Sequence, residues 1–177
     1  MFIMLYLYLL RHAKSSWNEP ALKDFDRPLA PRGWNAAPLM GGYMKKMNYQ
    51  PDTILCSPAK RTRETLDMIE RYLVKPHHIY MNESIYHADS SRLLGLVRSA
   101  AASTRKLMLI GHNPGIQELA LTLAGDGDRK SWQSMWSKYP TAALAVLSFD
   151  TEDWPRVKAR AGKLVDFKSP KILAKST

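Results

Sequence analysis

Two histidines follow apolar runs of the kind that form buried strands, each within two residues of the end of its run. His12 comes directly after Arg11 at the end of the first run, and His112 follows a later run, inside the loop Gly111–Gly115. If the two runs are parallel strands of one sheet, their carboxyl ends lie at the same edge, where open α/β sheets bind their ligands. A neutral imidazole is a good nucleophile and proton carrier near neutral pH. The two histidines together therefore indicate a reactive site.

Two arginines near the same edge point to an anionic substrate. Arg11 precedes His12, and Arg61 falls in the first turn of a predicted helix that follows Ser57. The planar guanidinium binds two phosphate oxygens at once and keeps its charge at all physiological pH values. The amides at a helix N-terminus also favour an anion. Together with the two histidines, these arginines would form a small positive pocket for which a phosphoryl group is the natural occupant.

The elements that position these residues alternate between strand and helix along the chain. This alternation favours parallel pairing of the strands through right-handed crossovers. We expect an α/β fold, a three-layer α/β/α sandwich with a mostly parallel central sheet flanked by helices, in a single domain over residues 1–177. The strands are expected at Ile3–Leu10, Asp52–Cys56, Ile79–Met81, Lys106–Ile110, Ala142–Phe149 and Val157–Phe167, with the last at an edge of the sheet. The helices are expected at Pro31–Met47, Ala59–Leu73, Ser90–Ala102 and Ile116–Ala124, with Ser90 or Ser91 capping the third.

Length and composition narrow the class of protein. The chain has 177 residues, of which 45% are hydrophobic and 24% are charged, enough apolar material for one packed core. A single cysteine, Cys56, excludes an internal disulfide and favours a reducing compartment. The apolar start, Met1–Leu10, is far shorter than the ~20 residues that cross a bilayer and lacks the features of a signal peptide. We therefore expect a cytoplasmic protein without a membrane partner.

The formal net charge of +10 is unevenly distributed. Residues Arg156–Thr177 hold seven basic residues and one acidic residue, a net charge of +6. Such a terminal segment is more often a solvated face or tail than a nucleic-acid reader, and we expect no nucleic-acid partner and an edge strand followed by a tail. A basic binding protein that has lost activity remains the non-enzymatic alternative, with its tryptophans and tyrosines available for stacking. Trp132 and Trp136, four residues apart, are instead expected to pack along a buried helix face.

Five segments, in the same order along the chain, resemble those of the histidine phosphatase superfamily, and within it the SixA-type phosphohistidine phosphatases. The superfamily signature Arg-His-Gly after the first strand is present as Arg11, His12 and Ala13, so that one glycine is replaced and the reactive residues are kept. The resemblance implies a phosphoglycerate mutase-like fold. The matching segments are Leu9–Trp17, Asp24–Gly33, Leu55–Thr65, Glu83–Ala88 and Ile110–Gly115.

The resemblance also implies a covalent mechanism. His12 would attack phosphorus and form a phosphohistidine intermediate that water hydrolyses. Arg11, Arg61 and His112 would hold the phosphoryl oxygens. His12 must be neutral to attack, so an acceptor should bind its other ring nitrogen. No metal and no other cofactor is expected.

The general acid stays open at this point. Glu83 is positioned where many members of the superfamily have a carboxylic acid that protonates the leaving group, and an ordinary loop carboxylate explains it equally well. Tyr86, His87 and Asp89 are rival donors. A phosphohistidine substrate has an imidazole leaving group, which needs less protonation than an alkoxide.

Two loop residues complete the candidate site. Ser15 or Ser16, shortly after His12, is a candidate donor to a phosphate oxygen, although an exposed loop explains them as well. Arg27 would either bind the substrate's phosphate or pair with a neighbouring aspartate, Asp24 or Asp26, and we favour the pairing.

Other chemistry is less well supported. Cys56 lies four intervening residues before Arg61 and six before Arg63, whereas cysteine phosphatases use five, so we expect Cys56 to be a small buried residue. The expected substrate is phosphohistidine or another phosphorylated protein side chain, and the alternative is a small phosphate ester; a mutase is less favoured because the chain is short. The oligomeric state is not predicted. A zinc site is a minor alternative that would need His77, His78, His87 and His112.

Overall fold

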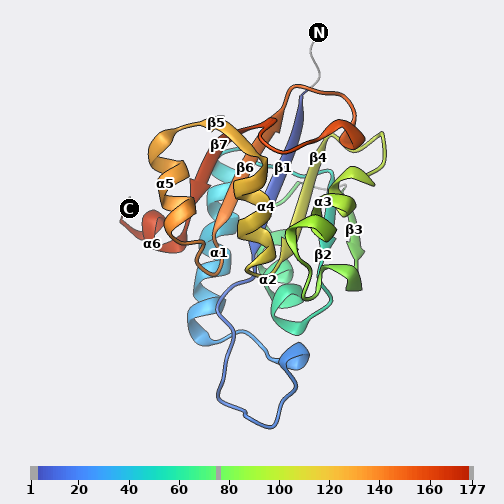
Figure 1. The fold of residues 1–177 in the computed structure, drawn as a ribbon. Helices are drawn as coiled ribbons and strands as arrows, with labels where there is room; N and C mark the ends of the chain where they lie inside the picture. The colour runs from blue at the N-terminus through green and yellow to red at the C-terminus, as the bar shows by residue number, and fades with distance from the viewer. Residues whose placement is uncertain (1–3, 75–76, 176–177) are drawn as a thin grey trace.

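The computed structural model describes residues 4–74 and 77–175 and contains one seven-stranded sheet, in the order β3-β2-β4-β1-β6-β7-β5 (Figure 1). The strands are β1 (Leu5–Arg11), β2 (Thr53–Cys56), β3 (His78–Met81), β4 (Lys106–Gly111), β5 (Ala124–Gly127), β6 (Leu144–Phe149) and β7 (Gly162–Lys168). The α-helices are α1 (Pro31–Lys46), α2 (Lys60–Glu70), α3 (Ser90–Arg98), α4 (Gly115–Leu123), α5 (Arg129–Ser137) and α6 (Pro170–Ala174). Ile3, where the first strand was expected to begin, lies outside the described residues.

The sheet is mostly parallel, as expected. Strands β3, β2, β4 and β1 run parallel to one another, β5 runs parallel to β7, and β6 alone runs antiparallel to the strands on both its sides, β1 and β7. The prediction that the last strand lies at an edge is wrong, because β5 pairs with the outer side of β7. β5 was missed because its sequence, Ala-Gly-Asp-Gly, has no apolar alternation. It depends on glycine: a Cβ on Gly125 would lie 1.8 Å from the Arg160 carbonyl oxygen, and Gly127 has a φ of +133°.

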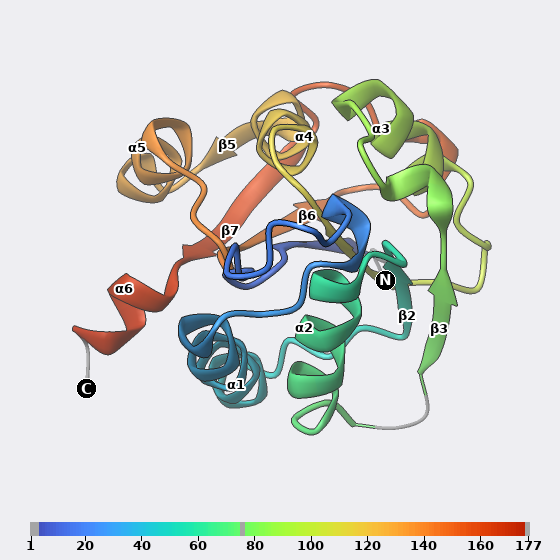
Figure 2. The same cartoon turned by 90° about the horizontal axis from the view of Figure 1, so that it is seen from below.

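Helices cover both faces of the sheet, which confirms the three-layer sandwich (Figure 2). Helices α1, α2 and α6 pack on one face and α3, α4 and α5 on the other. The side chains of β1 alternate between the two cores, Leu7 and Leu9 facing one and Tyr8 and Leu10 the other. Burial on both faces is the reason that this strand is a continuous apolar run.

The helices differ from expectation in three places. Helix α3 ends at Arg98 and its cap is Asp89, which accepts a hydrogen bond from the Arg92 N–H, so the prediction of a serine cap is wrong. Helix α5 was not predicted. The prediction that its two tryptophans pack along a buried face is wrong. Their rings stack on each other with centroids 5.4 Å apart, and Trp132 is 36% and Trp136 61% exposed.

The basic C-terminal segment belongs to the fold as far as it is described. It forms the internal strand β7 and the short helix α6, which packs against α1 through Leu173 and its neighbours. The expectation of an edge strand with a solvated tail is therefore wrong for residues 162–174. No helix in the described part of the chain is long and apolar enough to span a bilayer.

Candidate active site

Strands β1 and β4 bring the two predicted histidines side by side. Arg11, the last residue of β1, pairs in register with Gly111, the last residue of β4, and the His12 N–H donates to the Gly111 carbonyl at 3.0 Å. The imidazole rings of His12 and His112 lie with their centroids 5.2 Å apart. Figure 2 looks onto this edge of the sheet. The convergence that the sequence predicted is therefore present, because both residues follow parallel neighbouring strands.

The His12 ring is held in one orientation and one tautomer. Its Nδ1 lies 2.7 Å from the Ala13 carbonyl oxygen, which can only accept, so Nδ1 carries the hydrogen and Nε2 keeps its lone pair. The Ala13 N–H in turn donates to the Thr65 hydroxyl on α2 at 2.9 Å. The acceptor that the mechanism requires is thus a backbone carbonyl, itself anchored by a helix.

His12 is buried, and its surroundings keep it neutral. Burial lowers its pKa to about 3, and the positive charges of Arg61 and Arg11 act in the same direction, against the hydrogen bond to Ala13. A neutral ring with a free Nε2 is the form that attacks phosphorus.

Arg11 is positioned by a residue that sequence reasoning missed. Its Nη1 donates to the Tyr139 carbonyl at 2.8 Å. Tyr139 is fully buried and fixed to both neighbouring strands, since its hydroxyl donates to the Leu9 carbonyl at 2.6 Å and accepts from the Ala145 N–H at 3.0 Å. Among the described residues, the buried Nε of Arg11 has no hydrogen-bond partner and remains a donor for an anion.

Arg61, in the first turn of α2, is held by Asp24. Its Nη1 donates to the Asp24 carbonyl, and its Nη2 lies 2.9 Å from Oδ2 of the same residue. The Asp24 carboxylate also accepts from Tyr86 Oη at 2.7 Å and from Arg27 Nη1 at 2.9 Å. Partial burial would raise the Asp24 pKa, but these three donors hold it well below its usual range. Asp24 therefore stays anionic and orients Arg61, and it cannot supply a proton.

Arg27 makes the aspartate pairing that we favoured, which is confirmed. Besides Asp24, its guanidinium donates to the Ser16 carbonyl at 2.9 Å and to the Ser15 hydroxyl at 2.7 Å, and it lies 3.2 Å from the centre of the Trp17 ring. The arginine thus closes the loop that contains Asp24 and Ser15. Phosphate binding by Ser15 and Arg27 stays a prediction.

His112 presents a second unpaired nitrogen. Its Nε2 lies 2.8 Å from the Ser57 hydroxyl oxygen, and either of these two atoms can be the donor. Its Nδ1 is buried without a partner among the described residues. Burial and the charge of Arg61 lower the His112 pKa to about 3, so the ring is neutral. In the tautomer in which the Ser57 hydroxyl donates to Nε2, the ring has its Nδ1–H to offer an anion.

The candidate acids are arranged differently from the prediction. Glu83 is the first residue of a short 3-10 helix, Glu83–Ile85. It is exposed and takes part in none of the site contacts described above. The Tyr86 ring instead lies 5.5 Å from the His112 ring and 3.9 Å from the His87 ring, and Asp89 is the cap of α3. A role for Glu83 as general acid stays a prediction, while Tyr86 and His87 are the rivals that the fold brings close.

The other chemistries find no support. Cys56 is the last residue of β2 and is fully buried, which raises its pKa to about 12 and keeps it a thiol, so it is the small buried residue that was expected. Over the described ranges 4–74 and 77–175, no three His, Cys, Asp or Glu side chains gather as a metal site requires. The four histidines of the zinc alternative are thus not assembled as a site.

The depressed histidine pKa values predict a stability that falls in mild acid. In the unfolded chain His12 and His112 take up protons near pH 6.5, whereas in the folded protein they do so only near pH 3. The unfolded state therefore binds more protons in between, and the free energy of unfolding should fall by about 2 kcal/mol per histidine from pH 7 to pH 5. Urea denaturation at the two pH values measures this. In His12→Ala the pH dependence should shrink by one histidine's share, and equal stability of the wild type at pH 7 and pH 5 would contradict the assignment.

Comparisons with known proteins agree with this geometry. Residues 7–82 match the model of the histidine phosphatase superfamily (branch 1). The structure of a SixA phosphohistidine phosphatase candidate from Agrobacterium tumefaciens is 30% identical and superposes with a TM-score of 0.80 over 94% of this chain and 98% of that one. A corresponding structure from Nakamurella multipartitia is 25% identical, with a TM-score of 0.80 over 94% and 96%. An uncharacterised protein of Mycobacterium leprae is 31% identical over 92% of this chain and its own full length. This chain, with its phosphoglycerate mutase-like fold, belongs to branch 1 of the histidine phosphatase superfamily.

Proposed function

We propose that this protein is a phosphatase that removes the phosphoryl group from phosphohistidine, or from another phosphorylated side chain of a protein, through a covalent intermediate on His12. The observation that carries the proposal is the His12 ring, with Nδ1 hydrogen-bonded to the Ala13 carbonyl and Nε2 free, beside the unpaired Nε–H donor of Arg11 and the unpaired Nδ1 of His112. An anion bound by these donors would place its phosphorus against the nucleophilic nitrogen. The reaction that we infer takes place in the cytoplasm and needs no metal.

The proposed reaction has two steps. The lone pair of His12 Nε2 forms a bond to phosphorus while the bond from phosphorus to the substrate's nitrogen breaks, and the leaving imidazole takes a proton from solvent. Water then attacks phosphorus on His12 and the bond from phosphorus to Nε2 breaks, which gives inorganic phosphate and the free ring and returns a proton to solvent. Throughout, the fixed charges of Arg11 and Arg61 stabilise the negative charge that shifts onto the equatorial oxygens.

The carboxyl groups offer the site little acid assistance, which favours a nitrogen leaving group. Asp24 is held anionic by three donors, and Glu83 is exposed and makes none of the site contacts. Burial and the hydrogen bond to Asp24 raise the pKa of Tyr86, so its hydroxyl keeps its proton. An alkoxide needs a strong proton donor to leave, whereas imidazole needs much less. The same observation disfavours the alternative of small alkyl phosphate esters.

A comparison of leaving groups tests this proposal. With a chelator present, we expect hydrolysis of a phosphohistidine peptide and of an aryl phosphate, and kcat/KM for phosphoserine lower by about 10²-fold or more, the usual contribution of general acid catalysis. Release of inorganic phosphate measures all three rates. A phosphoserine rate equal to the phosphohistidine rate would favour the small-ester alternative, and loss of all activity in the chelator would contradict the metal-independent mechanism.

A further inference from the structure

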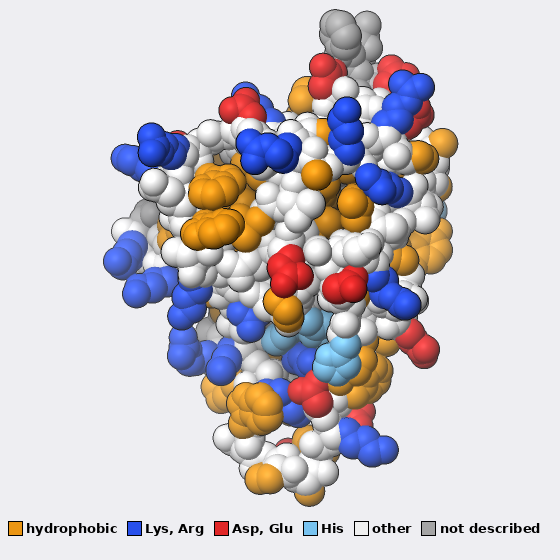
Figure 3. All heavy atoms as spheres, viewed as in Figure 1, with side chains coloured by type: hydrophobic (Ala, Val, Ile, Leu, Met, Phe, Trp, Pro, Cys, Tyr) orange, Lys and Arg blue, Asp and Glu red, His pale blue; other side chains and the backbone are white. Residues whose placement is uncertain are grey.

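Beside the catalytic edge of the sheet lies a groove of about 450 Å³ that four basic side chains line, here named the basic groove. They come from four separate segments: Lys14 follows the nucleophile, Arg32 is in the first turn of α1, Lys138 follows α5 and Lys171 is in α6. Figure 3 shows Lys and Arg side chains gathered at the lower left, over this side of the molecule. The fold, and not a local run of charge, therefore assembles the groove.

Positive charge in the basic groove is not neutralised within the protein. All four side chains are exposed, and none makes an ion pair or side-chain hydrogen bond with another described residue. No acidic side chain is among the residues that line the groove in the described part of the chain. Four uncompensated cations in one hollow repel one another and lower the energy of an anionic occupant.

The basic groove lies next to segments that position the candidate site. Lys14 is two residues from His12, and its carbonyl accepts from the Ala30 N–H at 2.8 Å, which fastens the start of α1 to the loop after the nucleophile. Gly33 packs so closely there that a Cβ would lie 2.3 Å from the Lys14 oxygen. The opposite wall includes Pro140, the residue after Tyr139, whose carbonyl holds Arg11. The groove therefore adjoins the two segments that hold His12 and Arg11, although neither of these two residues lines it.

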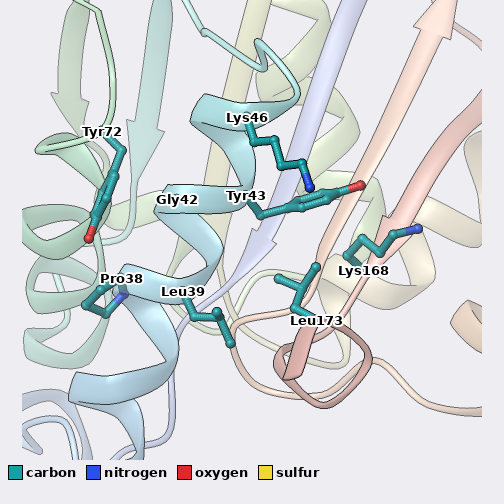
Figure 4. A pocket seen from close by; sticks show the side chains of 8 residues that line it. All are labelled: Pro38, Leu39, Gly42, Tyr43, Lys46, Tyr72, Lys168 and Leu173. Atoms are coloured by element: carbon teal, nitrogen blue, oxygen red, sulfur yellow. The ribbon is translucent and has the colours of Figure 1, made fainter. Parts of the chain in front are cut away.

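The surroundings of the groove are those of a protein interface. Leu39 lines both the basic groove and a second pocket of about 580 Å³ over α1 (Figure 4). In that pocket Leu39, Leu173 and Tyr43 offer apolar surface beside Lys46. A cationic groove that shares a wall with an apolar pocket is typical of protein-binding surfaces, whereas a nucleic acid would need a longer track of cations.

We propose that the basic groove binds an acidic segment of the phosphorylated protein substrate and so selects among phosphorylated proteins. This inference rests on the proposed function. It also gives Lys171, from the basic C-terminal segment, a role in recognition. Because the contribution is electrostatic, the selection should weaken as ionic strength rises.

Two matched phosphohistidine peptides test the proposal, one flanked by Asp and Glu and the other by Ser and Gln. For the wild type at low salt we expect kcat/KM about tenfold higher for the acidic peptide, and for the double variant Arg32→Gln, Lys171→Gln a ratio near one. The control is Lys158→Gln, Lys163→Gln, which removes two exposed charges near the opposite edge of the sheet and should keep the wild-type ratio. Equal ratios in the two double variants would overturn the proposal.

A binding measurement separates this inference from the proposed function. Fluorescence anisotropy of the labelled, unphosphorylated acidic peptide should give a Kd about tenfold weaker for the groove variant than for the control variant. If the acidic peptide binds in this way and neither phosphopeptide is hydrolysed, the groove stands and the proposed function fails. An oligonucleotide of equal charge that binds more tightly than the peptide, and through the same two residues, would assign the groove to nucleic acid and overturn the proposal.

Discussion

His12→Ala should abolish turnover, lowering kcat/KM for an aryl phosphate by roughly four orders of magnitude or more. In the proposed mechanism His12 forms the covalent bond to phosphorus, because its tautomer is fixed by the Ala13 carbonyl, its Nε2 lone pair is free and its ring lies beside that of His112. Rapid quenching under alkaline conditions should trap an acid-labile phosphoryl group on the wild-type protein and none on the variant. Phosphate release under multiple turnover measures the loss of rate.

The matched control for this substitution is His78→Ala. His78 is an exposed residue of the edge strand β3, which β2 and β4 separate from β1. Its replacement removes an imidazole without changing the candidate site. We expect wild-type activity from it. A phosphorylated intermediate that persists in His12→Ala, or residual activity within about tenfold of the wild type, would show that another group is the nucleophile.

Arg61→Lys should lower kcat/KM by about 10² to 10³, although the charge is conserved. The Arg61 guanidinium uses two nitrogens to bind Asp24 and has further N–H groups for the substrate, and an ammonium cannot reproduce that fork. Removal of one preorganised donor from a site that stabilises developing charge typically costs this much. Steady-state kinetics with an aryl phosphate, together with the Ki of inorganic phosphate, would measure the loss.

Arg63→Lys is the control, because Arg63 lies two residues further along α2 and is exposed, whereas Arg61 is 5% exposed. This variant should keep wild-type kinetics. A thermal melt of both variants shows whether Arg61→Lys also unfolds the protein. A folded Arg61→Lys variant with unchanged kcat/KM would contradict the assignment of Arg61 to the phosphoryl site.

Much of the fold follows from local patterns. Strand β1 is apolar on both faces because it lies between two layers of helices, so the run up to Leu10 is readable without a structure. Arg11, His12 and His112 were found because they end such runs, and parallel strands end at one edge. The antiparallel direction of β6 and the internal position of β7 could not be predicted, because an apolar run does not indicate which strands lie on either side of it.

The missed elements lack the pattern that burial imposes. Strand β5 consists of Ala, Gly and Asp, and it forms because its glycines fit against the Arg160 and Leu164 backbone. In helix α5 only Met135 is buried, so the helix buries little apolar surface, and its two tryptophans are partly or largely exposed. Where a segment buries little apolar surface, its conformation is decided by what it packs against.

The sequence by itself therefore determined the layered fold and the four residues at the reactive edge, since each depends on the apolar pattern of a single strand or the first turn of one helix. Tertiary structure alone decided which groups orient them. Asp24 binds Arg61 across 37 positions, and the Tyr139 carbonyl binds Arg11 across 128. It also assembled the basic groove from four segments. Such partnerships depend on the path that loops take between elements, and no local periodicity records that path.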